Sequence, residues 1–187
     1  MSHQHNSLIT AQPLLLPFRG TQALVVQAVL LASAVVLPII AHLLHAPVRM
    51  LLPMHWPVML AGMVYGWRSG AITGALAPLL SFLLSGYPLP NILPSMTAEL
   101  FVYGFVSGLL RQRYIINSFI SITASIIAGR IVFVLLVLIS HRAAIGEIEY
   151  FSAALLPGII PACLQIVTLP FVAQWIIKRK YSKDNTE

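Results

Sequence analysis

The chain has 187 residues, of which 58% are hydrophobic and only 9% are charged, and its mean hydropathy is +0.88. A soluble domain of this length could not bury so much apolar surface, so the composition indicates a membrane protein with room for about six spans of ~20 residues. We expect no separate soluble domain. The formal net charge of +6 comes from cations near the ends of apolar stretches, so we expect no nucleic-acid partner.

The apolar stretches predict an all-α integral membrane bundle of six transmembrane helices. A polar segment, 1–21, precedes a first span at residues 22–44. The second stretch, 50–67, contains Pro53 and Pro57, which remove backbone donors and bend helices, so we expect a loop that dips inward and then a short helix. The bundle is expected to occupy residues 22–177, and its remaining spans 69–84, 92–110, 116–140 and 151–177.

Lysine and arginine are distributed unevenly between the two sides of such a bundle. With the N-terminus inside, the outer segments hold Arg49 and Arg142, and Arg130 lies within a span. The positive-inside rule therefore places both termini in the cytoplasm, including a basic tail at 178–187. The inner segments hold the other cations: Arg19, Arg68, Arg111, Arg113, Lys178, Arg179, Lys180 and Lys183.

Glu99 and Arg130 are the two charged residues inside the expected spans. A charge in hydrocarbon costs at least ~3 kcal/mol, so such residues usually face a protein interior or a solvated cavity. Counting from the outer ends places Glu99 about 10 Å deep and Arg130 about 16 Å deep. Side chains lean toward the helix N-terminus, which separates the two in antiparallel spans, so a direct salt bridge and a bridging solute or water both stay open.

Two further polar residues accompany this pair. Tyr103 shares a helix face with Glu99, and Gln165 reaches a depth of about 18 Å, near Arg130. The four residues are interpreted either as a solute-contacting set or as a purely structural polar network.

The expected outer connections are rich in aromatic, amide and proline residues, which present rings and hydrogen-bonding groups as small-ligand sites do. They include His55 and Trp56 in the second stretch, and Tyr87 and Asn91 after the third span. An aromatic belt at the lipid headgroups is the alternative. That alternative explains Tyr150 well, but His55 and Asn91 poorly.

Small residues recur at four-residue spacing, which lets helix backbones approach closely in lipid. We expect the glycines to pack helices within one chain, whereas Ala28 and Ala32 on the first span fit an interface with a second protein at least as well. The glycines are Gly62, Gly66, Gly70, Gly74, Gly104 and Gly108.

Enzyme and metal signatures are weak. The chain has no Gly-Lys pair and so no Walker phosphate loop, and it lacks G-x-S-x-G and H-E-x-x-H. We therefore expect a non-catalytic protein without a cofactor. His42, His45 and His141 lie at outer span ends and could in principle ligate haem or a metal, although such histidines are more often interfacial. His3 and His5 lie in the polar N-terminal segment, where only an incidental metal site is expected.

In its order of motifs the chain resembles the substrate-capture (S) components of energy-coupling factor (ECF) vitamin transporters, from residue 22 to about 177. The resemblance rests on six short spans and on several segments in sequence order. They are Ala28-x-x-x-Ala32, 53–62, 65–70, Ala98-Glu99-Leu100, Tyr103-Gly104, Ala128-Gly129-Arg130 and Pro157-Gly158-Ile159-Ile160.

The resemblance implies a six-helix bundle in a bacterial cell membrane that binds a vitamin or vitamin precursor near its outer face. It also implies partners: a transmembrane coupling (T) component, docked on Ala28 and Ala32, and two cytoplasmic ATPases that drive release inward. By position in the family, solute contacts are expected from a set of residues on the outer loops and later spans. These are His55, Trp56, Tyr87, Asn91, Glu99, Tyr103, Arg130 and Gln165.

A cobalt and nickel subgroup of this family binds its ion through an N-terminal Met-His start. This chain begins Met1-Ser2-His3, so a metal substrate is not expected. Two other functions remain as alternatives: a haem- or quinone-linked membrane anchor using His42, His45 and His141, and an intramembrane enzyme using Glu99 as acid or base.

Overall fold

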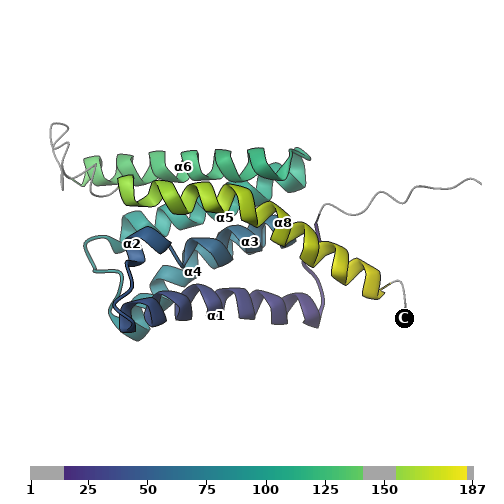
Figure 1. The fold of residues 1–187 in the computed structure, drawn as a ribbon, viewed down its shortest axis with the longest axis horizontal. Helices are drawn as coiled ribbons and strands as arrows, with labels where there is room; N and C mark the ends of the chain where they lie inside the picture. The colour runs from purple at the N-terminus through teal and green to yellow at the C-terminus, as the bar shows by residue number, and fades with distance from the viewer. Residues whose placement is uncertain (1–14, 141–154, 185–187) are drawn as a thin grey trace, which may run out of the picture.

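The computed structural model describes residues 15–140 and 155–184, and these residues form helices and no strands. Figure 1 shows the long helices running side by side. In chain order the elements are α1 (Thr21–Leu43), α2 (Val48–Leu51), α3 (His55–Tyr65), α4 (Trp67–Ser85), α5 (Leu93–Arg113), α6 (Ser118–Ile139), a 3-10 turn η1 (Leu156–Gly158) and α8 (Ile159–Asp184).

Five helical segments in the described part of the chain are long and apolar enough to cross a membrane. They are α1, α4, α5, α6 and the run Leu156–Ser182, and they match five of the six expected spans. The all-α membrane bundle is therefore confirmed, while the sixth expected span is the short helix α3. Helix α8 continues past the expected end at residue 177 into the basic tail, where Lys and Arg are good helix formers and complement the helix dipole.

The second apolar stretch is divided as its prolines predict. Helix α2 has four residues, and Leu52, which follows it, adopts a left-handed conformation with φ 44°. Helix α3 then has eleven residues, and Pro57 lies in its first turn, where a missing N–H costs no helical hydrogen bond. Nine of these eleven residues are buried, so this short helix is enclosed by protein rather than lipid.

Glycine fixes the junction between α3 and α4. Gly66 ends one helix and begins the next, with φ 88°, a value that L side chains rarely adopt. Its φ turns the chain between two helices that both pack on α5. The Gln112 side chain of α5 accepts a hydrogen bond from the Trp67 backbone N–H at 3.3 Å and holds this junction in place.

Helix α5 approaches α3 and α4 so closely that glycine is the residue that fits. A Cβ on Gly70 would overlap the backbone of Gly104, and a Cβ on Gly104 would overlap the backbone of Gly70. Gly74 lies in the same way against the backbone at Leu100, and Gly62 lies between the Gly104 carbonyl and Ser107. The expectation that the glycines pack helices within one chain is confirmed.

Helix α1 is fastened to α4 by a small polar contact. The Gln27 amide donates to the Thr73 hydroxyl at 2.7 Å, and the Ser69 hydroxyl donates to the Gln27 carbonyl oxygen. This contact fixes which side of α1 turns inward. Ala28 and Ala32 are exposed on the surface of the bundle.

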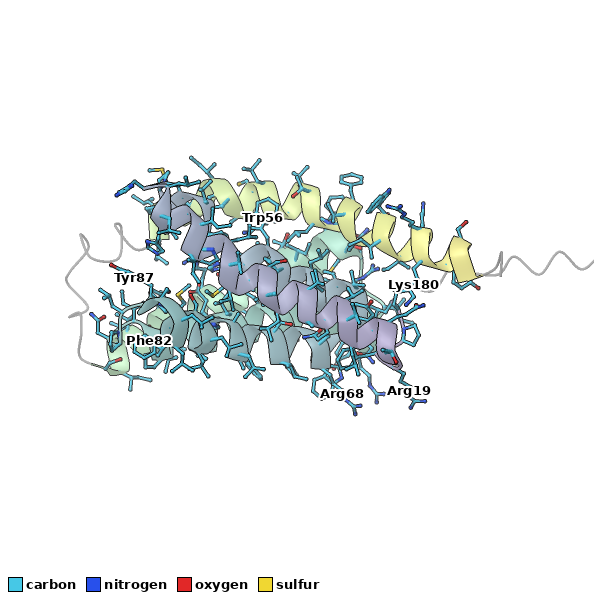
Figure 2. The ribbon with its side chains drawn as sticks, turned by 90° about the horizontal axis from the view of Figure 1, so that it is seen from below. Arg19, Trp56, Arg68, Phe82, Tyr87 and Lys180 are labelled. Atoms are coloured by element: carbon cyan, nitrogen blue, oxygen red, sulfur yellow. The ribbon has the colours of Figure 1, made fainter. Side chains whose placement is uncertain are left out.

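The residues directly before α1, from 15 to 20, lie against the end of α3. The Leu16 backbone N–H donates to the Val64 carbonyl at 2.8 Å, and the Leu16 side chain belongs to the buried core. The ring of Phe18 contacts Tyr65 edge-on, at 6.0 Å between centroids. Figure 2 shows Arg19, Arg68 and Lys180 gathered toward this end of the molecule, with Phe82 and Tyr87 toward the other.

Replacing Gly104 with leucine is expected to destabilise the bundle strongly. The new side chain would overlap the backbone of Gly70, which cannot move aside as a flexible side chain can. Overpacking of this kind typically costs about 1–3 kcal/mol or more. Thermal unfolding of purified protein in detergent measures the change. Ala32→Leu is the matched control, because it adds similar bulk at an exposed helical position. Equal unfolding temperatures for the two variants would contradict the close contact.

Candidate functional site

Glu99 on α5 and Arg130 on α6 form a direct ion pair, with 3.1 Å between Nη1 and Oε1. The Glu99 side chain is 4% exposed and the Arg130 side chain 21%, so the carboxylate lies within the bundle and Arg130 is the less buried member of the pair. The sequence left open whether the two residues pair directly or through a solute. The structure shows that they touch.

Tyr103 completes this pair from the next turn of α5. Its hydroxyl donates to Glu99 Oε1 at 2.7 Å, and the side chain is buried. Gly129, next to Arg130 on α6, leaves the space that the ring occupies, since a Cβ there would overlap the ring carbons of Tyr103. The i,i+4 spacing of Glu99 and Tyr103 therefore produces the contact that the sequence predicts.

His55 adds a ring at the first position of α3. The residue is 3% exposed, and its ring centroid lies 5.2 Å from that of Tyr103. The backbone N–H donates to the Leu52 carbonyl at 3.0 Å, which fixes the start of the helix. Neither Nδ1 nor Nε2 has a hydrogen-bond partner, although both are buried. Native proteins rarely leave buried polar atoms unpaired, so this ring calls for an explanation.

The beginning of the last helix closes the site on another side. A Cβ on Gly158 would overlap the guanidinium of Arg130 and would lie 3.6 Å from a methyl group of Leu52. The 3-10 turn η1 therefore meets α6 and the end of α2 at the guanidinium. We name the set Glu99, Tyr103, Arg130 and His55 the polar cluster; it joins α5, α6 and α3.

The other four expected contact residues have different surroundings. Gln165 is buried on α8 about two turns beyond Gly158, roughly 10 Å along the helix, and its amide nitrogen has no partner. The Trp56 indole N–H donates to the Leu51 carbonyl at 3.1 Å. Tyr87 is exposed and stacks on His42 at 4.5 Å between centroids, and Asn91 is exposed in the same connection.

Sequence reasoning did not assign a role to Gly129 or Gly158, which leave room for Tyr103 and Arg130 respectively. Both belong to the segments that carry the family resemblance. The available signals were that Gly129 directly precedes the charged Arg130 and that Gly158 lies at the start of the last helix. A glycine at such a place often marks a point where another group packs closely against the backbone.

The histidines proposed for haem or metal are only partly described. His42 stacks on Tyr87, and His45 is exposed with φ 52°. His3, His5 and His141 lie outside the described residues. Within residues 15–140 and 155–184, no group of three or more His, Cys, Asp or Glu side chains is arranged to hold a metal ion.

A comparison with protein families matches residues 22–178 to the ECF transporter, substrate-specific component family. The chain belongs to this family. It is thus an S component, a multi-pass membrane subunit that binds the substrate of an ECF transporter. Searches of curated proteins and of solved structures returned no match.

Tyr103→Phe is expected to lower the stability of this S component by about 1.5–3 kcal/mol, because Glu99 loses a hydrogen bond from a buried donor. Thermal unfolding in detergent provides the measurement. Tyr114→Phe, at the exposed end of α5, is the matched control and should change little. If both variants unfold together with the wild type, the hydroxyl has no stabilising role.

Proposed function

We propose that this S component captures a small vitamin or vitamin precursor from outside the cell, and that the polar cluster is the centre of its binding site. The carrying observation is His55: a buried ring beside an ion pair, with both nitrogens unpaired. Leaving a buried polar atom unpaired costs about 1–3 kcal/mol. A bound solute that pairs with these nitrogens would remove that cost.

A purely structural network is the competing interpretation of the polar cluster, and it fits only part of it. Glu99, Tyr103 and Arg130 satisfy one another as a structural network should. His55 lies against the same ring and pairs with none of them through its nitrogens. A network selected for stability alone would be expected to pair this side chain or to replace it with an apolar one.

The remaining expected contacts are assigned around this centre. Trp56 follows His55 directly, and Tyr87 and Asn91 lie in the connection between α4 and α5, so all three are proposed to line the approach from outside. Gln165 is proposed to contact the solute from α8, where its amide nitrogen is buried and unpaired.

The proposed orientation places the S component in a bacterial cell membrane with both termini in the cytoplasm. Its support is the distribution of Lys and Arg, with Arg19, Arg68 and Lys180 at one end of the molecule. At this end Arg68 and Arg179 lie over the rings of Trp67 and Trp175, each at 5.2 Å. Such Trp and Arg pairs suit a membrane interface, where amphipathic rings meet lipid headgroups.

Release inward is proposed to depend on a T component and two cytoplasmic ATPases, so this subunit itself is non-catalytic. The exposed pair Ala28 and Ala32 supports a docking face on α1, because small residues let a partner helix approach closely. The contact of Gln27 with α4 holds that face outward.

Arg130→Ala is expected to reduce the amount of small molecule retained by the purified protein, at least tenfold per folded molecule. Mass spectrometry of the solute released on denaturation measures it. Because this variant leaves Glu99 buried without its partner, a loss of stability of roughly 3–5 kcal/mol should accompany it. Retention is therefore compared only for monodisperse protein. Unchanged retention would remove Arg130 from the site.

Ala28→Trp and Ala32→Trp are each expected to abolish uptake by cells while leaving solute retention unchanged, since bulk on α1 would separate the docking faces. Uptake and co-purification of the coupling complex are measured together. Leu43→Trp is the control, with the same bulk at an exposed position at the far end of α1. Normal yields of the complex with either alanine variant would place the docking face elsewhere.

A further inference from the structure

We infer that the solute carries no net charge, and that it offers His55 a hydrogen-bond acceptor or donor, as a carboxamide or a lactam-type heterocycle does. This inference rests on the proposed function, and it narrows the solute to a chemical class.

The first argument concerns charge. Glu99 and Arg130 already neutralise each other at 3.1 Å, and Tyr103 uses its proton on the same carboxylate. An anionic group that approaches Arg130 must also approach Glu99, and a cationic group that approaches Glu99 must also approach Arg130. Either one gains one contact and also meets a repulsion, because both charges lie within a few ångströms in a weakly screened interior.

The ion pair is also difficult to separate. A solute carboxylate could take Arg130 for itself only by leaving Glu99, which is almost wholly buried, without its counter-charge. Breaking one half of a buried pair is strongly unfavourable, because the remaining charge stays desolvated. A neutral solute avoids this cost and can still accept a hydrogen bond from Arg130, whose guanidinium carries five N–H donors.

The second argument concerns His55. A neutral imidazole has one N–H donor and one lone pair, and both ring nitrogens of this residue are buried and unpaired. These two nitrogens point in widely divergent directions from the ring, so a small solute group pairs with one of them: an acceptor with the N–H, or a donor with the lone pair. Carboxamides and lactam-type rings carry both kinds of group without a formal charge, so they can pair with the imidazole at either nitrogen. A hydrocarbon could pair with neither nitrogen, and a bare carboxylate, which has no donor, could pair only with the N–H.

The test presents the purified S component, in detergent, with the small-molecule fraction of yeast extract at pH 7. Molecules retained after washing are released and identified by mass spectrometry, which gives their functional groups and net charge. We expect a neutral molecule with an amide or lactam-type group. His55→Phe should retain roughly tenfold less, and His55→Asn, which keeps a donor and an acceptor, should retain more than His55→Phe.

Three further outcomes separate this inference from the proposed function. A retained molecule with a net charge would overturn the inference and leave the capture function intact. Equal retention by wild type and folded His55→Phe would overturn the role of His55. A folded wild-type protein that retains nothing would contradict the capture function, and the inference would fail with it.

Glu99→Gln tests the charge argument directly, because Arg130 then stands without a carboxylate. We expect this variant to retain anionic molecules that the wild type excludes. The double variant Glu99→Gln with Arg130→Gln restores a neutral site, and the preference for anions should disappear. Identical retained molecules in wild type and Glu99→Gln, at identical amounts, would show that the ion pair does not select solutes by charge.

Discussion

The backbone contact of α5 with α3 and α4 is the constraint on which the rest of the bundle depends. Gly70 and Gly104 bring two helices together without side chains between them, and Gly74 continues the contact along α4. With one face of α5 used in this way, its other face carries Glu99 and Tyr103 toward α6 and the start of α3. Close packing of small residues in lipid therefore also determines where the polar groups meet.

The polar cluster is tolerated inside an apolar bundle because most of its polar groups pair with one another. The charge on Glu99 is met by Arg130, the hydroxyl of Tyr103 has an acceptor, and Gly129 and Gly158 leave the space that these large side chains need. His55 is the member whose nitrogens remain unpaired. The proposed binding site would thus combine a rigid set of mutually paired groups with one unpaired side chain, an arrangement that pre-organised binding favours.

Sequence patterns predicted the fold because membrane helices are read from uninterrupted apolar length, and that signal is strong in α1 and α6. The division of the second stretch into α2 and the buried α3 followed from its prolines. The direct contact of Glu99 with Arg130 could not be predicted, because depth counted from span ends gives no relative rotation or vertical offset of two helices. The stacking of Tyr87 on His42 could not be predicted either, because the conformation of a loop does not follow a periodic pattern in the sequence. Whether the eight expected residues together bind a solute stays a prediction.

The residues directly before α1, from 15 to 20, contribute to the folded core. Leu16 is enclosed, and its amide caps the carbonyl of Val64 near the end of the short helix α3. That helix has no further turn of its own to meet this carbonyl, so the backbone at Leu16 caps its end. Truncations or tags that replace these residues would therefore expose the end of α3 and part of the buried core to solvent. Proteins made for expression should keep these residues unchanged.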